Sequence, residues 1–312
     1  MQLAPICLFT YNRLSETKQT VEALQNNFLA KESDLFIFSD GGKNEVSKVK
    51  VQEVRAYIKT IVGFNSINIV ESIENKGLAN SIISGVTQVV NKYEKVIILE
   101  DDLITSPNFL NFMNQALDFY KNDAQVQSIN GFSLLINSNV NDVYFQTRPF
   151  PWGWATWQNR WREELFNKSE IKKEIDLNKE LLKNFKKKCG SDISKMLVDS
   201  VNGVNDSWYV RWTYNHFINK TISVYPKESL IANIGFGPDG THCNGINTYK
   251  YKLLEKTQTN FRFLKNKSLD KQTEKDFLKY FTYTYKFKAR LKYLSTKSGR
   301  KTLKDDIMEK LK

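Results

Sequence analysis

The segment VIILEDDLITSPNFLNF, residues 96–112, joins an apolar run directly to three consecutive acids, Glu100, Asp101 and Asp102. Adjacent carboxylates repel one another unless a positive charge compensates them. A divalent cation would do so, because Mg²⁺ and Mn²⁺ prefer oxygen ligands and often take one or two carboxylates, with phosphate and water completing the shell. The alternative is that the acids merely precede a helix, whose dipole favours negative charge. The direct junction with an apolar run favours the metal site.

The elements that must position these acids alternate along the first third of the chain. Continuous apolar runs predict strands, and the stretches between them carry apolar residues at helical spacing. Such an alternation is typical of a mostly parallel sheet covered by helices on both faces. Ser106 with Pro107 after it further predicts an N-cap and a helix to about Tyr120. The expected strands are residues 4–11, 35–38, 67–70 and 95–99, and the expected helices are residues 15–28, 46–61 and 78–90.

Polar residues follow three of the predicted strands, and ligands of such sheets bind beyond the carboxyl ends of the strands. The first strand ends in Thr10-Tyr11-Asn12-Arg13, the second in Ser39-Asp40-Gly41, and the fourth in the acidic triplet. The glycine-rich fingerprint GxGxxG follows none of these predicted strands, and the phosphate loop GxxxxGK[ST] is absent from the sequence. If a nucleoside diphosphate binds here, we therefore expect a metal ion to neutralise much of its charge.

Four short motifs together resemble the GT-A family of nucleotide-sugar glycosyltransferases, in particular N-acetylglucosaminyltransferase I and its bacterial relatives. The motifs are TYNR (residues 10–13), FSDGG (38–42), NKGLANS (75–81) and ILEDDL (98–103), the last an EDD variant of the DxD motif. The resemblance spans about residues 3–245. It implies a GT-A fold with Asp102 as ligand of Mn²⁺ or Mg²⁺, Glu100 and Asp101 on sugar or ribose hydroxyls, and Asp40 on uracil or ribose. Arg13 would lie near the nucleotide, and the same motifs make Thr10, Asn12 and Lys76 candidate donor-binding residues.

A dense aromatic segment, PFPWGWATW at residues 149–157, contains Trp152, Trp154 and Trp157. Tryptophan is usually buried, so core packing is the alternative. The segment is interrupted by Pro151 and Gly153, which fits no regular strand or helix face. It also resembles a recurring segment of bacterial sugar transferases. We therefore expect at least one ring, with Trp154 as the candidate, to stack on a sugar.

Asp206, in the run NDSWYVRW, is the candidate catalytic base. An inverting sugar transfer needs one carboxylate to take the proton of the acceptor hydroxyl. In the family that the chain resembles, an acid directly before a tryptophan has this role, whereas here Ser207 separates Asp206 from Trp208. The alternative is that Asp206 caps the helix expected through Phe217, and both roles are compatible.

The two histidines receive different interpretations. His242 ends the glycine-rich run NIGFGPDGTH, and the resemblance implies that such a loop closes over the donor, with His242 on the diphosphate or the metal. A lone histidine is nevertheless often structural. His216 lies inside a predicted helix, and we expect it to be structural.

The positive charge of the chain is concentrated at its C-terminal end. Residues 250–312 hold 19 basic and 7 acidic residues, so this segment alone accounts for the formal net charge of +12. Its lysines alternate with aromatic residues, which favours attachment to an anionic membrane over a solvated helix. Nucleic acid is the other anionic partner of such a composition, but no recognition motif supports it. We expect residues 1–245 to form the catalytic domain, divided near residue 105 into donor and acceptor halves, and residues 246–312 to form a basic extension.

The remaining composition, 41 % hydrophobic and 13 % aromatic, is that of a folded globular protein. No apolar run approaches the ~20 residues that span a bilayer, and the first residues lack the features of a secretory signal. The three cysteines have no paired spacing, which suits a reducing compartment and argues against a cysteine zinc site. We therefore expect a cytoplasmic protein, peripheral on the inner face of the plasma membrane.

The sequence thus predicts a metal-dependent, inverting glycosyltransferase. Its donor would be a nucleotide sugar, with UDP as the nucleotide, and its acceptor a glycan or a lipid-linked saccharide of a bacterial surface polysaccharide. Two alternatives stay open. One is a nucleotidyltransferase that makes sugar nucleotides, although its usual glycine-rich loop after the first strand is missing. The other is a carbohydrate-binding or membrane-associated scaffold without catalytic activity.

Overall fold

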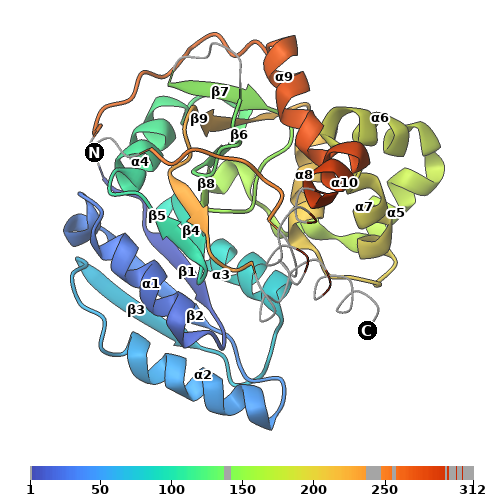
Figure 1. The fold of residues 1–312 in the computed structure, drawn as a ribbon. Coiled ribbons are helices and arrows are strands. Elements are labelled where there is room, and N and C mark those ends of the chain that lie inside the picture. The colour runs from blue at the N-terminus through green and yellow to red at the C-terminus, as the bar shows by residue number, and fades with distance from the viewer. Residues whose placement is uncertain are drawn as a thin grey trace.

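The computed structural model describes residues 2–136, 142–236, 247–254 and 258–291, together with Leu294, Arg300 and Lys304. The first hundred residues form the predicted alternation of strands and helices (Figure 1). The strands are β1 (Ile6–Thr10), β2 (Asp34–Ser39), β3 (Ser66–Glu71) and β4 (Lys95–Glu100). The helices are α1 (Leu14–Gln25), α2 (Glu45–Ile58) and α3 (Leu78–Tyr93).

These strands and four later ones form a single mixed sheet in the order β3-β2-β1-β4-β8-β6-β9-β7. The first four strands are mutually parallel, whereas β8 is antiparallel to both β4 and β6, and β7 is antiparallel to β9. The predicted class, a largely parallel α/β sheet flanked by helices, is confirmed. The later strands are β6 (Val126–Asn130), β7 (Val143–Gln146), β8 (Trp154–Trp157) and β9 (Ile222–Pro226).

Alternate residues of the strands point to opposite faces, and each face carries its own apolar core. Ile6 and Leu8 of β1 pack with residues of α1, α2 and α4 (Phe109–Phe119) on one face. Cys7 and Phe9 pack with residues of α3 and α8 (Trp208–Ile218) on the other. This double covering explains why the strands are continuous apolar runs in the sequence.

The second half adds a helical cluster beside the sheet. Helices α5 (Lys168–Leu177), α6 (Lys179–Cys189), α7 (Ile193–Val201) and α8 share a third apolar cluster. The C-terminal helices α9 (Lys271–Leu278) and α10 (Tyr283–Leu291) are joined to it by ion pairs of Glu274 with Lys188 and of Lys286 with Asp192 (Figure 1). A small antiparallel pair, β5 (Leu103–Thr105) and β10 (Ile231–Asn233), lies directly after the acidic triplet.

Two local expectations are wrong. Helix α4 begins at Phe109, and Ser106 does not cap it: its hydroxyl instead donates to Asn108 Oδ1 at 2.8 Å. The tryptophan segment does contain a regular strand, because Trp154–Trp157 forms β8 between β4 and β6. Gly153 makes the turn into this strand, with φ of 63°, a left-handed conformation that favours glycine.

The described part of the C-terminal segment packs into the main core. Phe261 meets Phe112 of α4 edge-on at 5.0 Å, and Phe277 meets Tyr225 of β9 at 5.3 Å. Phe277, Tyr280 and Phe281 are buried. These aromatic side chains are therefore not available to a membrane surface. The predicted domain boundary near residue 246 lies outside the described residues.

Candidate active site

The acidic triplet lies at the carboxyl end of β4, beside the carboxyl end of the neighbouring parallel strand β1. The register pairs Phe9 with Glu100, so the residues that follow each strand run side by side. Arg13, which precedes α1, donates through Nη2 to Asp101 Oδ1 at 2.5 Å and to Asp102 Oδ2 at 2.9 Å. The Tyr11 amide also donates to Asp101 Oδ2 at 3.3 Å. The structure thus brings together the first and fourth predicted strand ends.

Backbone contacts from two other elements hold the triplet in place. Thr20 of α1 donates its hydroxyl to the Asp101 carbonyl at 2.9 Å. The Ile234 amide donates to the Asp102 carbonyl at 2.9 Å. The next residue, Gly235, lies so close that a Cβ atom there would be 1.9 Å from Asp102 Oδ2. The segment after β10 therefore forms one wall of the site, and a side chain larger than that of glycine would displace the Asp102 carboxylate.

Burial and the neighbouring acids raise the pKa values of Glu100 and Asp101. Burial raises the pKa of Asp101 to about 6, with Arg13 lowering it and Asp102 raising it. Burial, then Asp102 and Asp101, raise the pKa of Glu100 well above its ordinary value. Burial lowers the pKa of Arg13, but the two aspartates more than offset this and leave it raised. One arginine therefore compensates the triplet only in part.

The oxygen atoms that Arg13 does not reach are the ones that could hold a ligand. Within the described ranges, the Glu100 carboxyl and Asp102 Oδ1 accept no hydrogen bond. No three His, Cys, Asp or Glu side chains converge on one point in the part of the chain that the structure describes. Mg²⁺ and Mn²⁺ do not require three, because phosphate oxygens and water complete their shell. The donor set of Glu100 and Asp102 fits such an ion in combination with a diphosphate.

Asp40 lies at the carboxyl end of β2 and is already fully engaged. Its two oxygens accept hydrogen bonds from the amides of Gly41, Lys76 and Gly77 at 2.9–3.0 Å and from Asn75 Nδ2 at 3.1 Å. A carboxylate has about four lone-pair sites, and all four are used here. Asp40 therefore organises the turn before α3. The Lys76 side chain is exposed, and only its backbone takes part in this network.

The other two residues of the first strand end lie beside the acids. Thr10 is buried and its hydroxyl is 3.5 Å from the Phe38 carbonyl of β2. Asn12 is half-buried, and its side chain has no hydrogen bond to any residue that the structure describes. Asn12 is thus the more available of the two for a ligand.

Trp154 has a core role in this structure. It is 1 % exposed, stacks on Trp208 at 5.2 Å, and also packs against Trp161 and Trp212. The expectation that its ring stacks on a sugar is not supported, because the cluster covers it. The alternation of β8 explains the burial: Trp154 faces α3 and α8, whereas Trp157 belongs to the core of the opposite face.

Asp206 precedes α8 and does not cap it. The cap is Ser207, whose Oγ accepts from the Val210 amide at 3.3 Å. Asp206 is 46 % exposed, and its Oδ1 pairs with Lys168 at 2.8 Å and Arg211 at 3.0 Å. Its Oδ2 has no partner within the described residues. No hydrogen bond or ion pair there joins Asp206 to the acidic triplet.

The histidine expectations have separate outcomes. His216 is fully buried, with ring nitrogens 3.1 Å from Ser128 Oγ and 2.9 Å from the Trp212 carbonyl. Its structural interpretation is confirmed. His242 lies outside the described residues, and its contact with a diphosphate or metal stays a prediction.

Two features of the site were not predicted from the sequence. The first is that Arg13 bonds the acids, a contact that needs the pairing of β1 with β4. The second is the wall formed by Ile234 and Gly235, whose only sequence signal is the glycine-rich run after residue 233. Arg55 of α2 was also missed: it is buried and donates to the carbonyls of Ser39 and Ser72, at 3.2 and 2.7 Å, and so fixes the end of β2.

Comparisons with known proteins give partial structural likenesses. No family model and no curated protein matches the sequence. The mannosyltransferase PcManGT of Pyrobaculum calidifontis, in complex with GDP-Man and Mn²⁺, is 11 % identical with a TM-score of 0.35, over 50 % of this chain and 45 % of its own. Residues 1–349 of S. aureus TarS are 10 % identical with a TM-score of 0.43, over 74 % and 60 %. The same part of TarS with UDP is 14 % identical with a TM-score of 0.32, over 44 % and 38 %.

This chain therefore spans less than two thirds of the length of each of these three structures. At such low identities and TM-scores, the function has to be inferred from the residues of the site.

Proposed function

We propose that this protein transfers a sugar from a nucleotide-sugar donor, with catalysis at the carboxyl ends of β1 and β4. The observation that carries the proposal is the partly compensated triplet, in which Arg13 binds Asp101 and Asp102 while Glu100 and one oxygen of Asp102 stay open. The nucleotide-sugar donor comes from the motif resemblance, with UDP as the proposed nucleotide. A saccharide or a lipid-linked glycan is the proposed acceptor.

Some residues of the site hold the acids in position, and others supply the charged oxygens that would bind a metal ion. Arg13 and the Ile234 amide fix the position of Asp102, and Thr20 fixes Asp101. Asp102, with Glu100, would hold Mg²⁺ or Mn²⁺. Such an ion, when bound, supplies positive charge that stabilises the departing nucleoside diphosphate. Asn12 follows β1, and its side chain has no hydrogen bond to a described residue, so it is proposed to contact the nucleotide.

Asp206 is proposed to act as the base of an inverting transfer. Its Oδ1 is held by Lys168 and Arg211, which leaves Oδ2 for the proton of an acceptor hydroxyl. The leaving diphosphate needs no proton when a metal neutralises it, so one base is sufficient. The ion pairs fix the orientation of this carboxylate on a partly exposed surface, where an acceptor could approach.

Isothermal titration calorimetry tests the donor site directly. UDP and GDP are titrated into the full chain with Mn²⁺, and again with EDTA. We expect UDP to bind with Mn²⁺, and the affinity to fall at least tenfold in EDTA and in Asp102→Asn. The matched control is Asp118→Asn, because Asp118 is a half-buried acid on α4 whose ion pair within the described residues is with Lys121. This control should bind as the wild type does.

The outcomes separate the alternatives. Binding followed by release of UDP from a UDP-sugar would support the transferase. Formation of a sugar nucleotide from a nucleoside triphosphate and a sugar phosphate would favour a nucleotidyltransferase. Absence of nucleotide binding under every condition would leave the scaffold and refute the proposed site.

A further inference from the structure

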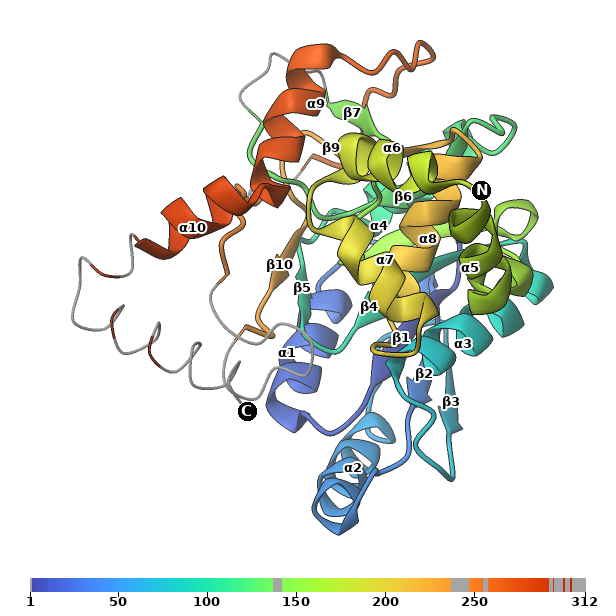
Figure 2. The same cartoon turned by 90° about the vertical axis from the view of Figure 1, so that its right-hand side faces the viewer.

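Helix α10 presents an apolar stripe to solvent. Tyr283 and Phe287 are 62 % and 63 % exposed, and Leu291 is 45 % exposed. The spacing of four residues between each pair places these three side chains along one face of the helix. Figure 2 shows α10 at the periphery of the molecule, away from the central sheet. The stripe is therefore not part of the core.

Basic residues lie on both sides of this stripe. At 3.6 residues per turn, Lys288 falls on one flank, and Lys286 and Arg290 fall on the other. Lys288 is exposed, whereas Lys286 pairs with Asp192 at 2.9 Å. An apolar face bordered by lysine and arginine is typical of helices that lie in the interface of a membrane.

A basic hollow adjoins the start of the same helix. Its volume is about 300 Å³, and Lys183, Lys186 and Lys187 of α6 line it together with Leu278 and Thr282. Thr282 directly precedes the stripe. Lys186 and Lys187 are exposed, and neither has an ion pair with any acid that the structure describes. The hollow itself is lined mostly by apolar atoms, and the lysines that border it add positive charge to this face of the molecule.

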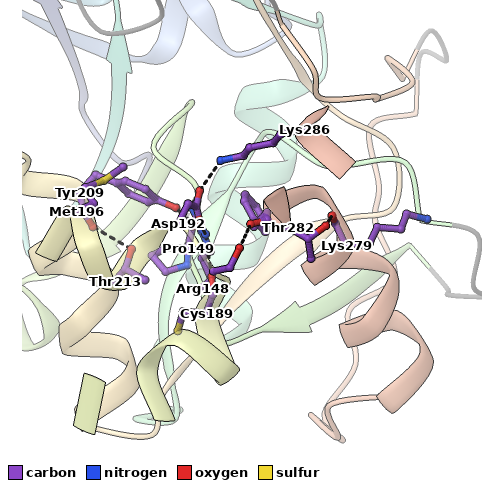
Figure 3. Close-up of polar contacts among 12 residues, drawn as sticks. Arg148, Pro149, Cys189, Asp192, Met196, Tyr209, Thr213, Lys279, Thr282 and Lys286 are labelled. Atoms are coloured by element: carbon purple, nitrogen blue, oxygen red, sulfur yellow. Dashed lines mark hydrogen bonds and ion pairs between the residues drawn. The ribbon is translucent and has the colours of Figure 1, made fainter. Parts of the chain in front are cut away.

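A buried polar junction holds α10 firmly against the helical cluster. Arg148 pairs with Asp192 at 2.8 Å and lies over the Phe281 ring at 3.6 Å, and Lys286 of α10 reaches the same Asp192 (Figure 3). The Tyr285 hydroxyl also donates to the Thr248 carbonyl at 3.1 Å. The buried side of α10 is therefore anchored, and its stripe is presented on a fixed base.

We propose that α10 and the lysine hollow dock on a bilayer that carries anionic lipids. The stripe would enter the boundary between headgroups and acyl chains, and the exposed lysines that border the hollow would contact lipid phosphates. A second copy of this chain is a poor occupant, because it would bring the same lysines together. A nucleic acid would leave the apolar stripe unused. The proposal does not depend on the proposed sugar transfer.

Vesicle co-sedimentation of the full chain tests this proposal. Vesicles of phosphatidylcholine alone are compared with vesicles of phosphatidylcholine mixed with phosphatidylglycerol. We expect binding only to the mixed vesicles, weakened by added salt. The double variant Phe287→Ser/Leu291→Ser should bind at least about tenfold more weakly, because it removes most of the apolar stripe. Lys186→Gln/Lys187→Gln should lose about fivefold per lysine.

Matched controls and contrary outcomes are available. Ile73→Ser changes a 97 % exposed apolar residue elsewhere, and Lys31→Gln/Lys50→Gln removes two exposed lysines outside this face, so both should bind as the wild type does. Circular dichroism melts establish that every variant is folded. Equal binding to both vesicle types, no binding to either, or full binding by Phe287→Ser/Leu291→Ser would each overturn the proposal. Binding to an oligonucleotide but not to vesicles would overturn it in favour of nucleic acid.

Discussion

Replacing Gly235 with alanine is expected to disable the proposed metal site while the protein stays folded. A Cβ atom at this position would lie 1.9 Å from Asp102 Oδ2 and 2.7 Å from its Cγ. Real contacts of Cβ atoms are essentially never below 3.0 Å, so one of the two residues must move by about 1.1 Å. The Gly235 amide is bonded to Asn233 Oδ1 at 2.8 Å, and the Ile234 amide to the Asp102 carbonyl at 2.9 Å. Because these bonds hold the backbone, the Asp102 carboxylate is the part that gives way.

The size of the effect follows from this displacement. The hydrogen bond from Arg13 to Asp102 Oδ2 measures 2.9 Å. Moving the carboxylate by about 1.1 Å would break this bond. Loss of a partner that orients a metal ligand typically weakens metal affinity about 10- to 100-fold. We therefore expect Mn²⁺-dependent UDP affinity to fall by about that factor. Overpacking also costs about 1–3 kcal/mol of stability.

Calorimetry of UDP with Mn²⁺ measures the affinity, and a urea titration measures the free energy of unfolding. The control is Gly203→Ala, which meets nothing within 4 Å but forces alanine into φ of 77°. It should lose about 1–2 kcal/mol and keep its affinity for UDP. A Gly235→Ala protein that binds UDP within twofold of the wild type would refute the assignment of Asp102 as the ligand.

Three further predictions concern stability and the base. Burial lowers the pKa of His216 to about 3, whereas the pKa of an exposed histidine is 6.5. Between pH 6.5 and pH 3 the imidazole is therefore protonated in the unfolded state but not in the folded state. The free energy of unfolding should therefore fall by about 2 kcal/mol from pH 8 to pH 5, and His216→Gln should flatten this dependence in urea titrations. Arg148→Met removes one of the two cations that pair with Asp192 in the described residues, and it should lower the free energy of unfolding by about 3 kcal/mol in the same assay. A loss below about 1 kcal/mol would show that the buried ion pair does not stabilise the fold. Once a donor sugar is found, Asp206→Asn should lower kcat about 100-fold or more with unchanged donor affinity, whereas an unchanged kcat would exclude Asp206 as the base.

The alternation of apolar runs with helical spacing was sufficient to predict the parallel half of the sheet. Each of β1 to β4 overlaps its predicted strand, because strands covered on both faces must be continuously apolar. The sequence also placed the polar strand ends at one edge. The start of α4 was predicted two residues too early, since Ser106 and Asn108 are both acceptable caps and only tertiary contacts choose between them.

What the sequence could not supply were contacts between distant segments. The tryptophan segment is irregular by composition, yet its strand runs between β4 and β6 and buries Trp154 against Trp208, more than fifty residues away. The aromatic residues of the C-terminal segment similarly divide into core and surface sets. Phe277 and Phe281 are buried by the sheet and its helices, whereas Tyr283 and Phe287 remain exposed, although the local composition of the two pairs is alike.

The number of open carboxylate oxygens ranks the acids that the sequence singled out. Asp40 accepts four hydrogen bonds and has no capacity left, so its proposed contact with a nucleotide would require the turn at residues 75–77 to open. Asp101 is engaged at both oxygens by Arg13 and the Tyr11 amide. Open oxygens remain on Glu100, Asp102 and Asp206. Composition and spacing treat all these acids as equivalent, but among contacts within the described residues only the last three have a carboxylate oxygen that accepts no hydrogen bond.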